Sequence, residues 1–194
     1  MKNLSYKIKS EIINRNMSEE MRILGLFRDG DPAASRALFE EYAGYLTAVC
    51  SRYLDNDADV EDVLQESFIT IFEEISEFEY RGKGSLKAWM SRIVVNRSLK
   101  HLRDSQRMVF MDIGDIDLPE EPDTESIPPG VIHELIRRLP DGYRTIFNLY
   151  VIEDRSHREI AQLLGITEST SASQLHRAKA MLATMIKDYQ NRTR

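Results

Sequence analysis

Apolar side chains recur every three or four residues through most of the chain, and this spacing predicts amphipathic helices rather than strands. Asp31-Pro32 is a good helix start. The apolar face of the helix that follows consists of Leu38, Tyr42, Tyr45, Val49 and Tyr53. DNDADVEDVLQESFITIFEEI predicts a second helix, whose apolar face consists of Val60, Leu64, Phe68, Ile71 and Ile75. After the glycine-containing break EFEYRGKGS, we expect Ser85 to cap a third, longer helix that ends near residue 107.

A second group of helices is predicted towards the C-terminus. VIHELIRRL is stopped by Pro140, and the apolar pattern resumes in GYRTIFNLYVIED. In SHREIAQLLGITESTSASQLHRAK, Ser156 and Glu159 have the spacing of a capping box. Gly165 would end the short helix that they begin, and Thr167 can cap the next one, whose inward face would consist of Ser171, Leu175, Ala178 and Leu182. A short helix, a glycine turn and a capped second helix form the helix-turn-helix pattern.

Residues 108–130 separate the two groups and lack sustained periodicity. They contain four prolines, two glycines and seven acidic residues, which indicates an acidic, flexible linker. The predicted fold is therefore all-α, with two small helical domains, residues 20–107 and residues 131–194, joined by this linker. Residues 1–19 are weakly amphipathic and are expected to form an N-terminal arm.

Charge is segregated along the chain, although the formal net charge is only −6. Residues 20–80 carry 15 acidic and 4 basic side chains, whereas residues 81–107 carry 8 basic and 1 acidic. A local basic stripe is what a nucleic-acid backbone would meet, so the negative total does not exclude nucleic acid as a partner.

Several other protein classes are disfavoured. No apolar run approaches the roughly 18 residues of a membrane span, and the N-terminus lacks the apolar core of a secretory signal. The single cysteine, Cys50, lies on an apolar helix face, so we expect a buried reduced thiol and a cytoplasmic protein. The four histidines show no metal-ligand spacing, and Val60 stands where a calcium-binding EF-hand loop needs glycine. We therefore expect neither an enzyme nor a metal or other cofactor.

The second helix of the helix-turn-helix pattern has a polar face that could meet DNA. Its outward or flanking residues are expected to be Thr170, Ser173, Gln174, His176, Arg177 and Lys179. Glutamine can pair with adenine, and arginine and lysine suit phosphates. The alternative is a plain helical hairpin with a solvated outer face.

The long helix before the linker offers independent evidence. An arc of about 80° on this helix holds Arg92, Asn96, Lys100, Arg103 and Arg107. Arg81 and Lys83 precede it, near two aromatic residues, and basic groups beside aromatic rings suit single-stranded nucleic acid. The alternative for the aromatic residues, Tyr80 and Trp89, is core packing.

Three stretches of the chain correspond, in order, to the conserved segments of one family. DVEDVLQESFITIF is similar to sigma region 2.2, LKAWMSRIVVNRSLKHLR to regions 2.3 and 2.4, and LPDGYRTIFNLYVIEDRSHREIAQLLGITESTSASQLHRAK to region 4. The chain thus resembles the small extracytoplasmic-function (ECF) group of the sigma-70 family, which keeps only regions 2 and 4. The resemblance covers nearly the whole chain beyond the N-terminal arm.

The resemblance implies a sigma factor whose partners are core RNA polymerase and promoter DNA. In the family, region 2.2 docks on the polymerase, and the residues implicated here are Asp59, Glu61, Asp62, Gln65, Glu66 and Phe68. Regions 2.3 and 2.4 melt and read the −10 element as a single strand, and the residues implicated are Arg81, Lys83, Ser85, Trp89, Arg92, Asn96, Lys100 and Arg103. Region 4 reads the −35 element as duplex, through the outward residues named above. Many relatives also have an anti-sigma factor, which is a further candidate partner.

Two departures from the family pattern affect the expected DNA contacts. Lys100 stands where relatives often have an acidic residue, and Ala172 and Gln174 stand where they often have basic ones. We infer a −35 preference that depends on Gln, Ser and Thr contacts and on DNA shape. Ser171 replaces a usually apolar residue and is expected to loosen the C-terminal domain. Two rival functions are a stand-alone helix-turn-helix regulator that binds duplex DNA as a dimer and an adaptor that binds only protein.

Overall fold

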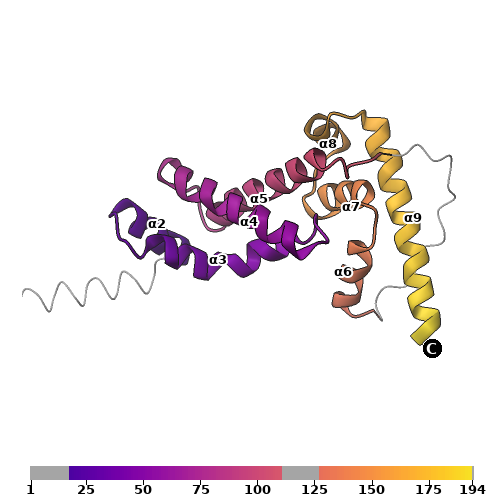
Figure 1. Cartoon of the computed structure of the whole chain (residues 1–194), viewed down its shortest axis with the longest axis horizontal. Helices are drawn as coiled ribbons and strands as arrows, with labels where there is room; N and C mark the ends of the chain where they lie inside the picture. The colour runs from indigo at the N-terminus through magenta and orange to yellow at the C-terminus, as the bar shows by residue number, and fades with distance from the viewer. Residues whose placement is uncertain (1–17, 111–126, 194) are drawn as a thin grey trace, which may run out of the picture.

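The computed structural model describes residues 18–110 and 127–193, and every regular element within these ranges is a helix. The N-terminal bundle consists of α2 (Glu19–Arg28), α3 (Ala34–Cys50), α4 (Asp57–Glu74), the short 3-10 helix η1 (Ile75–Glu77) and α5 (Ser85–Asp104). The C-terminal bundle consists of α6 (Pro129–Arg137), α7 (Asp141–Phe147), the π-helical turn η2 (Asn148–Ile152), α8 (His157–Leu164) and α9 (Glu168–Thr193). The two bundles lie end to end (Figure 1). The prediction of an all-α fold with two helical domains is confirmed, while the N-terminal arm and most of the predicted linker lie outside the described residues.

The N-terminal bundle buries the apolar faces that the sequence pattern predicts. From the first predicted face, Leu38, Val49 and Tyr53 are at most 1% exposed, and Tyr42 is also buried. The helix starts differ in detail from the prediction. Asp31 does not cap α3 directly; its Oδ1 accepts a hydrogen bond from Ala33 N at 2.8 Å and forms the turn before the helix. Asn56, whose Oδ1 accepts from Ala58 N at 2.9 Å, caps α4.

The C-terminal bundle is organised around α9, against which α7, α8 and α6 pack. Helix α6 begins at Pro129, inside the stretch predicted as linker, because proline is well tolerated at the first helical position, where its missing N–H has no helical partner. The predicted helix over GYRTIFNLYVIED is regular only in α7 and widens into the π-helical η2.

The two bundles meet where α7 approaches the end of α3. Arg144 of α7 is 1% exposed, and its guanidinium donates to the carbonyl oxygen of Tyr53 at 2.8 Å from Nη2 and at 3.2 Å from Nε. Asn148 Nδ2 donates to the carbonyl oxygen of Arg52 at 2.6 Å. Both carbonyls follow the last turn of α3 and lack helical partners of their own, so side chains of the C-terminal bundle supply the hydrogen bonds that a helix end needs.

Candidate polymerase and nucleic-acid interfaces

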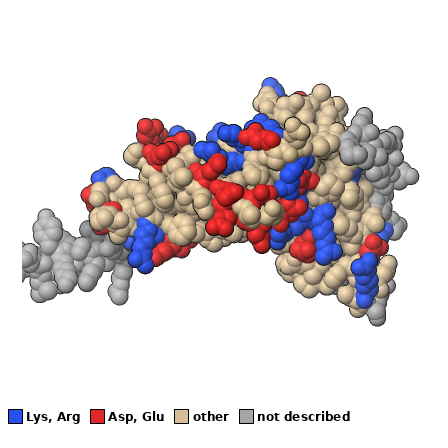
Figure 2. Space-filling model, viewed as in Figure 1, with Lys and Arg blue, Asp and Glu red and all other residues tan. Residues whose placement is uncertain are grey.

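Helix α4 presents an acidic face to solvent. Four of the six residues predicted to dock on polymerase lie exposed on this helix, namely Glu61, Asp62, Gln65 and Glu66. Glu66 is paired with Arg97 of α5 at 3.1 Å, but its side chain is 63% exposed, so the pair is weak and can be exchanged for a partner's charge. In Figure 2, acidic side chains gather in the middle of the face shown. The remaining two residues predicted to dock on polymerase, Asp59 and Phe68, are less exposed than these four.

Phe68, the other of these two predicted docking residues, is only 6% exposed. Its ring lies 4.9 Å from that of Phe39 and 5.8 Å from that of Phe72, measured between centroids. These rings form the floor of a groove of about 720 Å³ between α3 and α4. Phe39 and Ile69 stand on the groove with 51% and 57% of their surface exposed. An acidic face beside an apolar groove can bind a partner that carries both basic and apolar side chains.

Helix α5 carries an exposed basic stripe. Arg92, Asn96, Lys100 and Arg103 are all exposed along one side of the helix. Arg107 does not continue the stripe, although its spacing predicts that it should. The helix ends at Asp104, and Gln106 adopts the left-handed conformation with φ of 56°. The chain therefore turns back, with Arg107 N donating to the carbonyl oxygen of Leu102 at 3.0 Å.

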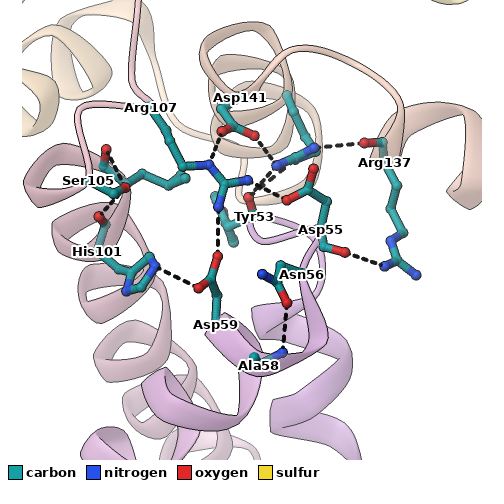
Figure 3. A network of polar contacts seen from close by, with 12 residues as sticks. Tyr53, Asp55, Asn56, Ala58, Asp59, His101, Ser105, Arg107, Arg137 and Asp141 are labelled. Carbon is teal, nitrogen blue, oxygen red and sulfur yellow. Dashed lines mark hydrogen bonds and ion pairs between the residues drawn. The ribbon is translucent and has the colours of Figure 1, made fainter.

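Arg107 instead lies at the centre of a cluster of carboxylates, which Figure 3 shows. Its Nη1 donates to Asp59 Oδ2 at 2.7 Å, its Nε donates to Asp141 Oδ2 at 2.8 Å, and its Nη2 donates to Asp55. Asp59 also lies 3.4 Å from His101 Nε2, and its side chain is 22% exposed. The predicted docking residue Asp59 is thus half-buried and already engaged within the chain.

The same cluster perturbs the ionisation of Asp55. Partial burial alone would raise the pKa of this carboxyl group. The hydrogen bond from Arg107 and the positive charges of Arg144 and Arg107 outweigh burial and lower the pKa of Asp55 below its ordinary value of 3.8. Asp55 is therefore ionised throughout the physiological pH range.

The loop before α5 is held in place by a residue that is distant in sequence. Gly84 adopts a left-handed conformation with φ of 91° and occupies the N-cap position, so the prediction that Ser85 caps α5 is wrong. Ser85 is the first helical residue, and its Oγ accepts a hydrogen bond from Arg81 N at 3.2 Å. The helix start is capped by Glu20 of α2, which accepts from Gly84 N at 2.8 Å and from Lys87 N at 3.3 Å. Glu20 is 7% exposed, and sequence reasoning missed it because a helix cap from a remote helix leaves no local pattern.

The loop and the first turns of α5 surround a small pocket of about 440 Å³. Four of the residues predicted for −10 contacts line it, namely Arg81, Ser85, Trp89 and Arg92. Trp89 is half-buried, and its ring centroid lies 5.1 Å from that of Phe78, which also lines the pocket. Glu77 and Glu79 contribute negative charge to the same walls. Aromatic walls and carboxylates suit an unstacked base better than a phosphate, whereas the stripe on α5 suits the backbone.

The helix-turn-helix pattern is present as predicted. Ser156 and Glu159 form a full capping box at the start of α8, and Gly165 ends that helix with φ of 69°. Thr167 Oγ1 accepts from Thr170 N at 3.0 Å at the start of α9. The predicted inward residues Ser171, Leu175, Ala178 and Leu182 are all buried.

The outer face of α9 is narrower than predicted. His176 and Lys179 are exposed, and Thr170 and Ser173 are half-exposed. Gln174 and Arg177 are 1% and 5% exposed, so the prediction that they face outward is wrong for this conformation. Both side chains are engaged in interactions within the chain. A helical pattern tells which residues share a face, but it does not tell whether a second face is also covered.

Ser171 has a hydrogen-bond partner in the bundle. It is fully buried, and its Oγ lies 2.9 Å from Nδ1 of His157 at the start of α8. The His157 ring stacks on Tyr150 of η2 at 4.6 Å between centroids. The hydroxyl that replaces an apolar side chain is thereby satisfied, which reduces the cost of its burial.

Other predicted features can also be compared with the described residues. Cys50 is buried, and its burial raises the pKa of its thiol to about 11, as expected of an unreactive reduced cysteine. In residues 18–110 and 127–193, no three His, Cys, Asp or Glu side chains gather as metal ligands would. None of the helices in these ranges combines the length and the apolar character needed to cross a membrane.

Comparisons with known proteins agree with the division into two bundles. The family model for sigma-70 region 2 matches residues 38–108, and that for sigma-70 region 4 matches residues 130–182. The ECF RNA polymerase sigma factor SigW of Bacillus subtilis is 27% identical over 176 residues, which cover 83% of this chain and 93% of SigW. The ECF RNA polymerase sigma-E factor of Haemophilus influenzae is 27% identical over 82% of this chain and 90% of its own. Among solved structures, CnrH in complex with the cytosolic domain of CnrY aligns with 88% of this chain and 99% of that chain, at 21% identity and a TM-score of 0.47.

Proposed function

This chain belongs to the ECF group of the sigma-70 family, and we propose that it directs RNA polymerase to a specific set of promoters and opens them. In this proposal, residues 20–107 form the region 2 domain and residues 131–194 the region 4 domain. The acidic face of α4 binds the polymerase, the loop before α5 and the basic stripe on α5 bind the −10 element, and α9 binds the −35 element.

The observation that carries the proposal is the opposite charge of two faces of the same bundle. The exposed acidic residues lie on α4, and the exposed basic stripe lies on α5, which packs directly against α4. A single small domain can therefore hold a basic protein surface on one side and a nucleic-acid backbone on another. A protein that bound only other proteins would not need a stripe of purely positive charge on α5, because solvated surfaces usually intersperse positive and negative side chains.

The pocket beside Trp89 supports a role in strand opening. Its aromatic and acidic walls can receive a base that has left the duplex stack, while Arg92 and the rest of the stripe neutralise phosphates. Removing a base from the stack costs a few kcal/mol, and a pocket that binds the flipped base offsets this cost. Opening then follows from binding, without any chemical step by the protein.

The outer face of α9 supports the inference that contacts with the −35 element contribute only modestly to promoter binding. The exposed residues that remain for DNA are short or singly charged, namely Thr170, Ser173, His176 and Lys179. A recognition helix with so few long basic side chains has little affinity for duplex DNA by itself, because neutralisation of phosphates supplies most of such affinity. We infer that binding to this element depends on tethering through the polymerase.

The rival functions are less well supported. A stand-alone helix-turn-helix regulator would not need the acidic face of α4, and family membership does not favour it. An anti-sigma factor that covers one or both domains stays a prediction.

The test of the proposal is a charge reversal on α4. The double variant Asp62→Lys, Glu66→Lys should lose binding to core RNA polymerase, because it replaces two exposed negative charges on the docking face. The matched control is Glu73→Lys, Glu74→Lys, which reverses two exposed charges at the other end of the same helix. Co-purification of both double variants with core polymerase, at the level of the unmodified chain, would refute the docking assignment.

A further inference from the structure

Two of the acidic residues proposed to bind polymerase are paired with basic side chains of the DNA-binding helix α5. Glu66 of α4 lies 3.1 Å from Nη1 of Arg97. Asp59, two turns earlier on α4, lies 3.4 Å from Nε2 of His101. Arg97 thus places a positive charge beside a face that must attract a basic partner, and a like charge at an interface opposes binding. The presence of an arginine at this position therefore needs an explanation.

Two hydrogen bonds hold the guanidinium of Arg97 against α4. Its Nη1 donates to Glu66 Oε2 at 3.1 Å, and its Nη2 donates to Thr70 Oγ1 at 2.8 Å. The Thr70 hydroxyl in turn donates to the carbonyl oxygen of Glu66 at 3.2 Å, which leaves its own lone pairs free to accept from Arg97. The side chain of Arg97 is 34% exposed, whereas that of Glu66 is 63% exposed. This arrangement fixes the arginine in the free chain but leaves the carboxylate accessible to a partner.

The ion pair between Arg97 and Glu66 contributes little to the fold. A pair with a mostly exposed carboxylate changes stability only slightly, because water screens the charges and both side chains lose conformational freedom. Helices α4 and α5 pack on each other through the apolar core, to which the fully buried Ile71 and Val94 belong. A substitution that removes only the charge of Arg97 should therefore leave the N-terminal bundle folded, and stabilisation of the bundle does not explain the arginine.

Arg97 borders the basic stripe on α5. At 100° per residue, Arg97 lies about 60° beyond Lys100, which is the edge of the stripe on that side. Residues three positions apart on a helix are neighbours, so the two side chains are adjacent. In the free chain Glu66 neutralises Arg97, and the positive charges that remain exposed along the stripe are those of Arg92, Lys100 and Arg103. Release of Arg97 from Glu66 adds a further positive charge beside them.

We propose that Arg97 is a contact for the DNA backbone, which Glu66 neutralises in the free chain and which docking of α4 on polymerase releases. This inference rests on the proposed function, because the polymerase supplies the basic surface that takes Glu66 from Arg97. The freed guanidinium turns towards the strand bound along the stripe and donates paired hydrogen bonds to a phosphate, a geometry that suits arginine. Glu66 exchanges one cation for another, so the cost of breaking the internal pair is offset.

The exchange of partners at Glu66 couples polymerase binding to DNA binding. Because one carboxylate cannot hold both Arg97 and the polymerase, docking raises the affinity of the chain for DNA. By linkage, bound DNA raises the affinity of the chain for polymerase by the same factor. The strength of an exposed ion pair limits this factor to about two- to fivefold. The coupling lies within the N-terminal bundle and requires only the rearrangement of two side chains.

Arg97→Gln distinguishes this role from a structural one, because it should change two affinities in opposite directions. It removes the charge that competes for Glu66, so the variant should bind core RNA polymerase about two- to fivefold more tightly. The assembled complex should bind a fluorescent single-stranded DNA of mixed sequence more weakly. The slope of log affinity against log salt concentration should become shallower by about 0.7, the value for one lost phosphate contact. Arg97→Lys, which keeps a positive charge, should restore most of the slope.

A second set of variants tests the neutralisation of Arg97 without polymerase. Glu66→Gln breaks the ion pair in the free chain. At low ionic strength, its binding to the same DNA should show a salt slope steeper by about 0.7 than that of the unmodified chain. The double variant Glu66→Gln, Arg97→Gln should return to the slope of the unmodified chain. The matched control is Glu73→Gln, which removes an exposed carboxylate two turns further along the same side of α4 and should leave the slope unchanged.

The contrary results bear on different parts of the proposal. Weaker binding of Arg97→Gln to both polymerase and DNA would make Arg97 a structural residue and overturn the proposal. An unchanged salt slope in the Arg97→Gln complex would overturn the phosphate contact. Equal slopes for free Glu66→Gln and Glu73→Gln would overturn the neutralisation by Glu66. If core polymerase does not bind the unmodified chain, the proposed function fails and so does release by docking, whereas the slopes of the free variants still decide whether Glu66 neutralises Arg97.

Discussion

Glu20 is the residue whose replacement tests most sharply how the DNA-binding loop is held. Its carboxylate accepts hydrogen bonds from Gly84 N at 2.8 Å and Lys87 N at 3.3 Å, at the start of α5. Glu20→Ala removes both acceptors and leaves two helix-terminal N–H groups without a partner. It also removes a negative charge from a helix N-terminus, which is its favourable end.

The expected size of the effect follows from these two bonds. A hydrogen bond to a charged group contributes about 1.5–3 kcal/mol, and the longer second bond contributes less. We therefore expect Glu20→Ala to lower the free energy of unfolding of the N-terminal bundle by about 3 kcal/mol. Glu20→Gln keeps one acceptor oxygen but loses the charge, and should cost about 1 kcal/mol. The control is the neighbouring Glu19→Ala, which breaks only an exposed pair with Arg22 and should cost less than about 0.5 kcal/mol.

The assay uses the single tryptophan of the chain. Trp89 packs on Phe78 in the N-terminal bundle, so its fluorescence during urea denaturation reports on that bundle alone. Promoter opening by the Glu20→Ala complex should fall as well, because the residues of the loop between 81 and 85 lose their fixed position. Equal midpoints for Glu20→Ala and Glu19→Ala would refute the idea that this carboxylate holds the start of α5.

Three further predictions concern the base pocket, the C-terminal bundle and the carboxylate cluster around Arg107. Trp89→Ala should weaken binding of the polymerase complex to a single-stranded −10 oligonucleotide roughly tenfold or more, since stacking contributes about 1–3 kcal/mol per base. Trp89→Phe should retain most of the binding. Unchanged binding in the alanine variant would exclude the Trp89 ring as a stacking partner for a base. His157→Ala should lower the stability of the C-terminal bundle by about 1–2 kcal/mol, because it leaves the buried Ser171 hydroxyl without its partner. The same substitution in a Ser171→Ala background should cost clearly less. Equal costs of His157→Ala in the two backgrounds would contradict the pairing. The pKa of Asp55 is lowered by Arg107 and Arg144, so the contribution of its carboxylate to stability is complete above about pH 4 and is lost as the pH falls through its lowered pKa. The free energy of unfolding should decrease on acidification below about pH 4, and should decrease less in Asp55→Asn. A decrease of equal size in that variant would assign the effect to another group.

Local features of the fold were predictable because their causes are local. The apolar faces of α3, α4 and α9 follow from the helical period, and the capping box of Ser156 and Glu159 and the left-handed Gly165 follow from short-range backbone chemistry. The exposed stripe from Arg92 to Arg103 was predictable for the same reason. These features depend on residues that are close in sequence, so the amino-acid sequence alone is sufficient to predict them.

Features that depend on the packing of distant helices were not predictable. Glu20 caps a helix more than 60 residues away, and Arg144, which the sequence places on a short helix, is buried under the end of α3. Arg107 has the spacing of a stripe residue, but the left-handed Gln106 turns the chain so that Arg107 reaches Asp141 in the C-terminal bundle. The misplacement of Gln174 and Arg177 has a similar origin, because the burial of a second face of α9 is not a property of α9 alone.

The central claim, that this chain confers promoter recognition on RNA polymerase, is tested most directly by transcription from a library of random upstream sequences. The purified protein is assayed with and without core polymerase from the same host. The account predicts polymerase-dependent initiation from templates that share a pair of sequence elements, and negligible DNA binding by the free chain. Specific duplex binding without polymerase, together with no new initiation in its presence, would contradict the account and favour a stand-alone regulator.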